Sequence, residues 1–507
     1  MKKIYFYLFA LSLVAVLNAC NDDEFLQENP PFLSPISFYQ TESDAVAGLN
    51  PVYWSLKGFY YSGWDIMYYG YNVPALNVLM SEVGIAPESD WSVPDRFQFT
   101  ASSEKFIHEV WQSGYYGIFK ANVCIEGIER CEIPNETLKN RLLAEGKFIR
   151  ALHYYTLVRF YENIPLIKST SDDLYSTNVG TYDAVYDFIF EDLQFAIGNL
   201  PDAYTGADQG RVTRGAALGF LAKAYLDYGD YANAAKYSDM IIKEGKYKLY
   251  PINELMSNWD ENHKNEKGWE RMFEIQNTTE YGQEGSNGIM SGYTGPMYKN
   301  PSAGSGFDWG TMQATHNFYD SYSPDDKRRS IVLIDHYYSY LDKDTVWYND
   351  GNTYLINPLS AKYVEWDATA AVMNQRNYVL LRYADVLLVN SEAKIMQGIF
   401  TDESFAGINA VRERAGLQPL VPANETIESM KDKIIDERQW ELSFENTEYF
   451  DLVRMNKLAE RNARQTTLDD QGNEVQLIDY VTEMYNRLPI PDKEINLNPN
   501  LKQNPGY

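Results

Sequence analysis

The segment from Gly210 to Ile242 limits the possible folds more than any other part of the sequence. It reads GRVTRGAALGFLAKAYLDYGDYANAAKYSDMII, and its apolar residues recur every three to four positions on both sides of Gly229-Asp230. This spacing predicts two antiparallel amphipathic helices joined by a tight turn. Small residues such as Ala222 and Ala234 let the helices approach closely, while larger residues fill the groove beside them. A pair of this kind needs similar neighbours to bury its remaining apolar surface.

Other parts of the chain supply such neighbours. The Gly210–Ile242 spacing is that of a tetratricopeptide repeat, and the apolar residues between Tyr186 and Pro201 match the second helix of a similar unit. A third pair is expected at Leu381–Gln397 and Glu403–Arg414. We therefore predict an all-α dominated fold of tetratricopeptide-like helix pairs in one cooperative body, with a loop-rich insert and a few short strands.

Further long helices are predicted from apolar periodicity alone. Thr41 begins a capped helix, and longer ones are expected at Ser103–Arg130, Leu138–Tyr161 and Tyr182–Leu200. Five aromatic residues follow the helical spacing and are expected in the core: Trp54, Trp111, Tyr154, Tyr155 and Trp440.

Two regions lack this periodicity. Residues 59–99 and 251–375 are rich in Gly, Asn, Ser, Asp and aromatic side chains, a composition typical of long functional loops. Short strands are expected in the second region at Met272–Gln276, Ile331–Tyr340 and Thr345–Leu355, the last folded as a hairpin around Asn349-Asp350-Gly351.

The first twenty residues have the pattern of an export signal. Two lysines precede an apolar run from Ile4 to Leu17, which is shorter than the roughly 20 residues that a membrane-spanning helix needs. The run ends at Leu17-Asn18-Ala19-Cys20, which resembles a bacterial lipobox. Residues 1–19 are therefore predicted to be a lipoprotein signal peptide and Cys20 to be acylated; an ordinary cleavage site that contains Cys is the alternative.

The two remaining cysteines are Cys124 and Cys131. Seven helical residues separate them by about 10 Å, beyond disulfide reach, so we expect buried free thiols. A disulfide would require the helix to end between them.

Charge and motifs argue against several functions. The chain has 507 residues with 71 acidic and 44 basic side chains, a net charge of −27, which disfavours nucleic acid as a partner. It contains no zinc-protease motif, no Gly-x-Ser-x-Gly elbow and no phosphate-binding loop. Asp342, Asp344 and Asp350 do not fit a calcium loop, so no metal and no cofactor is predicted. A glycosidase needs only two carboxylates and stays an alternative.

Six stretches in order resemble the SusD/RagB family of Bacteroidetes outer-membrane lipoproteins, and together they span nearly the whole chain. They are AEGKFIRALHYYTLVRFYENIPL (Ala144–Leu166), the repeat at Gly210–Ile242, NYVLLRYADVLLVNSEAK (Asn377–Lys394), INAVRERAGL (Ile408–Leu417), IIDERQWELSFENTEYFDLVR (Ile434–Arg454) and LPIPDKEINLNPNLKQNPGY (Leu488–Tyr507). At Asn446-Thr447 many members carry Gly instead. The resemblance implies one SusD-like domain over residues 20–507, with an N-terminal part of about 20–250 and a C-terminal part of about 251–507.

The resemblance also implies a function. Members of the family are receptors rather than enzymes: they cap a SusC-like TonB-dependent transporter, bind a glycan or sometimes a peptide, and release it into the pore. The acidic run Asn21-Asp22-Asp23-Glu24 resembles the surface-export signal of Bacteroidetes lipoproteins. The expected location is the outer membrane, anchored by lipid and exposed on the cell surface.

Charged residues inside the matching stretches are expected to form structural ion pairs rather than to contact a ligand. They are Arg150, Arg159, Arg382, Arg412, Arg414, Glu437, Arg438, Glu441, Asp451 and Arg454.

Aromatic residues in the two loop regions are the predicted ligand site. Sugars present apolar faces beside hydroxyl-rich edges, so a glycan site offers flat rings together with polar side chains. We expect the two regions to converge, although any one aromatic could instead fill the core. The candidates are Trp64, Tyr68, Asp90, Trp91 and Arg96 in the first region, and Tyr281, Tyr293, Trp309 and Trp366 in the second.

Overall fold

The computed structural model describes most of the chain after residue 37. The described residues are 38–61, 64–86, 92–177, 179–266, 268–278, 290–299, 309–348, 357–366, 374–468, 474–476, 478 and 480–507. The predictions for residues 1–19, Cys20 and the turn at Asn349-Asp350-Gly351 therefore lie outside the described residues.

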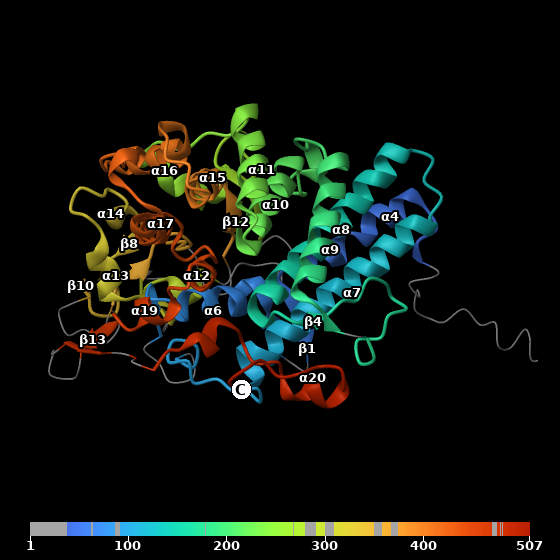
Figure 1. The fold of residues 1–507 in the computed structure, drawn as a ribbon, viewed down its shortest axis with the longest axis horizontal. Helices are drawn as coiled ribbons and strands as arrows, with labels where there is room; N and C mark the ends of the chain where they lie inside the picture. Colours follow the sequence, from blue (N-terminus) through green and yellow to red (C-terminus); the bar gives the residue numbers. More distant parts are fainter. Residues whose placement is uncertain are drawn as a thin grey trace, which may run out of the picture.

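The N-terminal half is built mainly of long helices (Figure 1). Thr41 begins the first with the predicted capping box, in which its side chain accepts the N–H of Asp44. The helices are α4 (Glu42–Gly48), α5 (Asn50–Trp54), α6 (Val73–Leu79), α7 (Glu109–Arg130), α8 (Glu136–Tyr161), α9 (Tyr182–Asn199), α10 (Arg214–Tyr228) and α11 (Tyr231–Glu244). Two π-helical turns, η1 (Tyr68–Asn72) and η2 (Glu104–His108), precede α6 and α7.

The C-terminal half has shorter helices between its loops. They are α12 (Met290–Thr294), α13 (His316–Ser321), α14 (Arg329–Val332), α15 (Tyr383–Met396), α16 (Asp402–Ala415), α17 (Ile427–Leu442), α18 (Glu448–Arg454), α19 (Leu458–Asn462) and α20 (Asp492–Leu497). Among the described residues, no helix combines the length and the apolarity that crossing a membrane requires.

Successive helices pack on one another as a repeat fold requires. From α7 to α11 each helix packs on the next, then α11 packs on α15 and α15 on α16. The predicted pair is confirmed: α10 and α11 meet at Gly229, whose φ of +91° ends α10 in the left-handed conformation that glycine adopts most easily. The third predicted pair is confirmed as α15 and α16.

The strands are short, and most of them lie in the two loop regions. They are β1 (Gly58–Tyr61), β2 (Trp64–Met67), β3 (Gly84–Ile85), β4 (Ile164–Pro165), β5 (Val179–Gly180), β6 (Arg271–Ile275), β7 (Gln313–Ala314), β8 (Leu333–Ile334), β9 (His336–Ser339), β10 (Asp344–Trp347), β11 (Leu359–Ser360), β12 (Tyr378–Arg382), β13 (Thr466–Leu468) and β14 (Glu474–Gln476). The order β3-β7-β11-β8 forms the largest sheet among the described residues, and the others join two strands each.

Three sequence predictions need correction. Ile331–Tyr340 is not one strand: Ile331 and Val332 end α14, and the strands that follow separate because β8 pairs with β11 whereas β9 pairs with β10. The helix expected from Ser103 is interrupted at Phe106, which has a φ of +69°. Trp54 is 44% exposed because it ends a five-residue helix at the protein surface, whereas Trp111 and Tyr154 are buried as expected.

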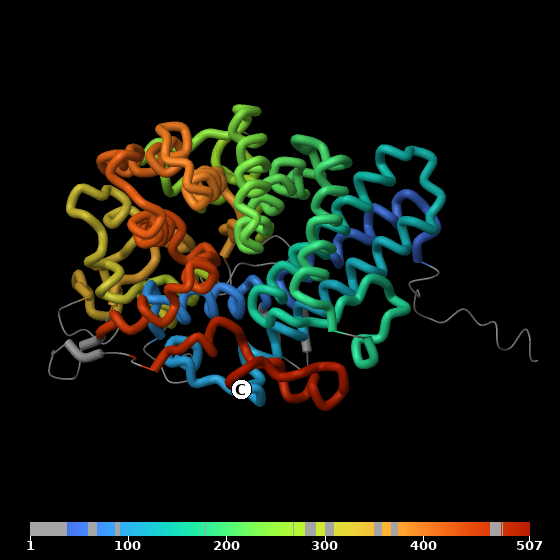
Figure 2. Tube along the Cα trace, viewed as in Figure 1, coloured from blue at the N-terminus to red at the C-terminus, as the bar shows by residue number. Residues whose placement is uncertain are grey.

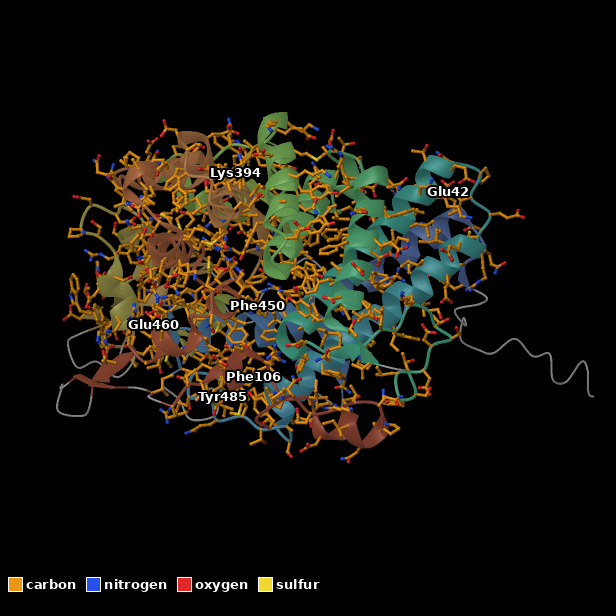
Figure 3. The ribbon with its side chains drawn as sticks, viewed as in Figure 1. Glu42, Phe106, Lys394, Phe450, Glu460 and Tyr485 are labelled. Carbon is orange, nitrogen blue, oxygen red and sulfur yellow. The ribbon has the colours of Figure 1, made fainter. Side chains whose placement is uncertain are left out.

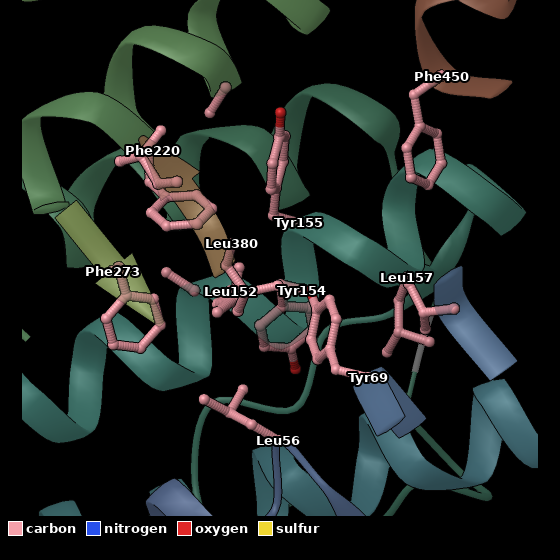
Figure 4. Packing of buried hydrophobic residues seen from close by; sticks show 14 of the residues in the cluster. Leu56, Tyr69, Leu152, Tyr154, Tyr155, Leu157, Phe220, Phe273, Leu380 and Phe450 are labelled. Atoms are coloured by element: carbon pink, nitrogen blue, oxygen red, sulfur yellow. The ribbon is translucent and has the colours of Figure 1, made fainter. Parts of the chain in front are cut away.

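One apolar core joins segments that are distant in the sequence. Tyr69, Leu157 of α8, Phe220 of α10 and Phe450 of α18 belong to the same cluster (Figure 4). Side chains fill the spaces between the helices, with Phe450 in the interior (Figure 3). The N-terminal α6 lies among C-terminal segments (Figure 2), where Asn77 Nδ2 donates to Asn446 Oδ1 over 2.6 Å. The two halves therefore share one apolar core.

Both later cysteines are buried free thiols, as expected. Cys131 follows the last residue of α7, so the helix continues through the whole interval between the two residues.

Buried charges occupy the space between the C-terminal helices. Arg382, 1% exposed, donates to Glu270 (2.9 Å), Glu441 and Glu445 (2.6 Å). Glu441 also accepts from Arg328 (3.1 Å) and Arg414. Burial opposes the ionisation of Glu441, but the three guanidinium groups outweigh it and hold its pKa well below the usual range.

The remaining charged residues of the matching stretches are paired as well. The ion pairs are Arg150–Asp192, Arg159–Asp227, Arg412–Glu437, Arg438 with both Asp385 and Asp451, and Arg454–Glu392. The expectation of structural ion pairs is confirmed.

Replacing Arg382 tests how much this network contributes to stability. Arg382→Leu removes the one cation that Glu270, Glu441 and Glu445 share and leaves these buried carboxylates with excess negative charge, so we expect the free energy of unfolding in urea to fall by about 3–5 kcal/mol. Arg464→Leu is the control, because the Arg464–Glu460 pair is about half exposed on both sides. It should cost less than about 1 kcal/mol. Equal losses in the two variants would contradict the structural role of the network.

Candidate ligand-binding surface

The short helix α12 organises the loop-rich side of the protein. All five residues of Met290–Thr294 are buried, although glycines surround this stretch in the sequence. The carbonyl oxygen of Gly292 accepts the N–H of Trp309 over 2.6 Å. The hydroxyl of Ser291 accepts the N–H of Glu365 over 3.3 Å. One helical turn thus fixes the backbone of two separate loops.

Two tilted aromatic contacts in a row support the exposed ring of Trp309. The ring of Trp309 lies 5.0 Å from that of Tyr293, and Tyr293 lies 3.7 Å from Tyr71, measured between centroids. Tyr71 and Tyr293 are 1% and 4% exposed, whereas Trp309 is 39% exposed. Trp366, which follows Glu365, is 44% exposed. A large ring on a rigid aromatic base is a suitable surface for the apolar face of a sugar.

The two loop regions converge, as the sequence analysis predicted. Strand β3 of the first region pairs antiparallel with β7 of the second, with Gly84 opposite Ala314 and Ile85 opposite Gln313. The Tyr71–Tyr293 contact joins the same two regions.

Asp95 bonds to Ala86, the last described residue before the segment that contains Asp90 and Trp91. Its side chain is 1% exposed, and Oδ2 accepts the N–H of Ala86 over 2.9 Å. Oδ1 has no hydrogen-bond partner among the described residues. Burial raises the pKa of Asp95 to about 7. Arg96 beside it is exposed, as its candidate role requires.

The other predicted site residues have different positions. Tyr68 is fully buried and stacks on His153 at 5.3 Å, so in this arrangement it packs in the core and does not reach the surface. Tyr68 belongs to the π-helical turn η1, which buries the side chains of Tyr68, Tyr69 and Tyr71. Asp90, Trp91, Tyr281 and the side chain of Trp64 lie outside the described residues, and their roles stay predictions.

A second aromatic surface was missed by the sequence analysis. The hairpin of β9 and β10 exposes His336, Tyr338, Tyr340 and Trp347. The rings of His336 and Trp347 stack at 4.1 Å, and those of Tyr338 and Tyr340 meet edge to face at 5.0 Å. The N–H of Tyr340 donates to the carbonyl of Tyr298, shortly after α12. His336, Tyr338 and Tyr340 stand at every second position of the sequence, so in a strand their side chains point to the same face. This spacing is the signal that could have revealed the surface.

The chemistry of this side of the protein favours binding by rings and hydrogen bonds. No group of three or more His, Cys, Asp or Glu side chains within the described ranges could hold a metal ion. The exposed indoles and phenols instead offer flat faces beside polar edges.

Comparison with known proteins agrees with this architecture. A model of the SusD family matches residues 265–507, and a second one, described as starch-binding and associating with the outer membrane, matches residues 80–226. The chain belongs to the SusD family. The resemblance drawn from the six sequence stretches is thereby confirmed.

Relatives match this SusD family member over its length. A SusD-like protein of Formosa agariphila is 28% identical over 533 residues, which cover 100% of this chain and 99% of that protein. The crystal structure of a SusD homolog from Bacteroides thetaiotaomicron has a TM-score of 0.78 at 22% identity, covering 93% and 98% of the two chains. A laminarin-binding SusD-like protein has a TM-score of 0.72 at 26% identity, covering 92% and 100%.

The buried carboxyl of Asp95 predicts a dependence of stability on pH. Its pKa is about 7 in the folded protein and about 3.9 in an unfolded chain. The folded state therefore holds this proton more tightly, and its stability falls as the pH rises from about 4 through 7. Asp95→Asn does not titrate and keeps an acceptor for Ala86. We expect it to be more stable than the wild type at pH 8 by on the order of 1–3 kcal/mol, and equal to it near pH 4.

Urea denaturation at the two pH values measures this difference directly. Other titrating groups are common to both proteins and cancel in the comparison. A stability difference that is the same at pH 4 and pH 8 would show that Asp95 does not carry the raised pKa.

Proposed function

We propose that this protein captures a glycan at the cell surface and delivers it to a SusC-like TonB-dependent transporter. The observation that carries the proposal is the exposed Trp309 ring on the buried Tyr293–Tyr71 pair, with Trp366 beside the same helix α12. The starch-binding description of the second family model and the laminarin-binding relative support a carbohydrate ligand. Under this proposal the protein binds its ligand without altering it.

The proposed location follows from the N-terminus. Acylation of Cys20 after removal of residues 1–19 would tether the body to the outer membrane, and the acidic run that follows would direct it to the cell surface. The family model described as associating with the outer membrane supports this location.

Tryptophan replacements test the binding surface. We expect Trp309→Ala and Trp366→Ala each to weaken retention on the recognised polysaccharide by about tenfold or more, since each removes a stacking face. Trp54→Ala is a matched control, because Trp54 is also 44% exposed but lies on α5, which packs on α7 and α8. Affinity electrophoresis against a panel of polysaccharides, and then peptides, measures the effect.

Two results of that experiment would contradict the proposal. One is retention that survives both loop replacements but is lost in Trp54→Ala. The other is sustained release of shorter products from a retained glycan, which would make the protein a hydrolase.

The transporter partner is tested in the native membrane. We expect a TonB-dependent barrel protein to co-purify with the tagged wild-type chain from detergent-solubilised outer membrane. Cys20→Ser should lose its fatty acid and leave the membrane fraction, because a lipid anchor is the proposed attachment. Repeated purification of the acylated chain without any barrel protein would argue against delivery to a transporter.

A further inference from the structure

The end of the chain, residues 488–507, packs against the turn before α7 and the end of α8 (Figure 1). The N–H of Leu488 donates to the carbonyl oxygen of Phe160 over 2.7 Å. The N–H of Asp492 donates to the carbonyl oxygen of Ala101 over 2.9 Å. The last segment is therefore attached to parts of the N-terminal half that are far from it in the sequence.

A histidine lies at the centre of this contact. His108 ends the turn η2 and is 7% exposed. Its Nδ1 lies 2.8 Å from Oε1 of Glu104 on the same turn, and its Nε2 lies 3.2 Å from Oε1 of Glu494 on α20. Each ring nitrogen thus faces one carboxylate, and the two carboxylates come from opposite ends of the chain.

This geometry requires an additional proton. A neutral histidine donates from only one ring nitrogen, and an ionised carboxylate can only accept. Both hydrogen bonds therefore exist together only while His108 and its two partners share one more proton than a neutral ring beside two carboxylates would hold. When that proton leaves, a nitrogen lone pair faces a carboxylate oxygen, and the contact becomes repulsive.

The electrostatics agree with the geometry. The hydrogen bond with Glu494, and after it the one with Glu104, raises the pKa of His108 above its usual range, although burial opposes this. Burial also opposes the ionisation of Glu104, but hydrogen bonds from Lys493 and His108 outweigh it and lower the pKa of Glu104. The contact therefore favours a charged ring between ionised partners.

Histidine is the only side-chain type in this contact that ordinarily titrates near neutral pH. Lysine, tyrosine, aspartate and glutamate have ordinary pKa values below about 5 or at about 10. The other ionisable groups around the three residues are Lys105 and Glu109 on the segment of His108, Asp492 and Lys493 on α20, Tyr115 on α7, Tyr161 on α8 and Tyr175 between β4 and β5.

We propose that Glu104, His108 and Glu494 form a pH-sensitive clasp, which holds residues 488–507 on the N-terminal half in mildly acidic solution and loosens them in mildly alkaline solution. The sign follows from linkage. The pKa of His108 is higher in the folded protein than the value of about 6.5 in an unfolded chain, so the stabilisation is complete below about pH 6.5. It is lost as the pH rises through the folded-state pKa.

The clasp also borders the first loop region. The ring of Tyr507 lies 6.4 Å from that of Phe99, and the hydroxyl of Ser102 donates to Asp492. Phe99 and Ser102 follow Arg96, a candidate ligand residue, in the sequence. We therefore expect residues 96–103 to loosen together with the end of the chain. This inference does not depend on which ligand the Trp309 surface binds.

Hydrogen exchange of the purified full-length protein, read by mass spectrometry and corrected for the intrinsic effect of pH, tests the clasp. In the wild type we expect residues 488–507 to exchange about tenfold faster at pH 8.5 than at pH 6. Glu494→Gln should exchange slowly at both pH values. The amide group that it introduces can donate to the neutral ring of His108, while the other ring nitrogen still donates to Glu104.

Two further measurements separate the clasp from other effects of pH. A proton NMR titration should give His108 a pKa above about 6.5 in the wild type and a lower one in Glu494→Gln; His108→Gln identifies the signal. His263→Gln is the matched control, because His263 pairs with Glu266 alone on the protein surface. It should leave the exchange of residues 488–507 unchanged.

Three results would overturn the proposal. One is the same pH dependence of exchange in the wild type and in Glu494→Gln. Another is fast exchange of Glu494→Gln at both pH values, which would show that the carboxylate itself rather than the shared proton holds the segment. The third is a pKa of His108 at or below about 6.5. Asp95 and Glu109, whose pKa values burial raises, are present in all these proteins and cancel in the comparison.

Discussion

The buried carboxylate of Glu441 is the interaction on which the C-terminal half of the structure depends. Arg328, Arg382 and Arg414 converge on it from three different segments. Taking these charges out of water is costly, and only their mutual contacts offset that cost. The segments must therefore keep one arrangement, because any displacement leaves a buried charge unpaired.

This constraint extends to the proposed ligand surface. Lys362 is buried, and its ammonium group donates to Glu445 over 2.6 Å and to the carbonyls of Glu441 and Ser443. Glu445 also accepts from Arg382, so Lys362 belongs to the same network. Four residues further along, Trp366 is exposed beside α12. The ion pairs of the scaffold thus hold the start of the loop that carries a candidate binding residue, in keeping with sites placed on loops of a rigid body.

The sequence predicted those parts of the structure that depend on local periodicity. The helix pairs at α10–α11 and α15–α16 and the capping box at Thr41 follow from spacing and cap chemistry. Trp54 was misjudged because periodicity does not reveal where a five-residue helix lies relative to the surface. The buried position of Tyr68 and the helix α12 were not predictable, because tertiary contacts set both. Composition indicated that the loop regions meet but not that Tyr71 and Tyr293 form the contact.

The most direct test of the account is a crystal structure of the protein with an oligosaccharide of the polysaccharide that it retains. The account predicts a sugar ring stacked on the exposed face of Trp309, with its hydroxyl groups toward the polar edges of the neighbouring loops. An oligosaccharide bound at full occupancy elsewhere, with the Trp309 face left in contact with solvent, would contradict it.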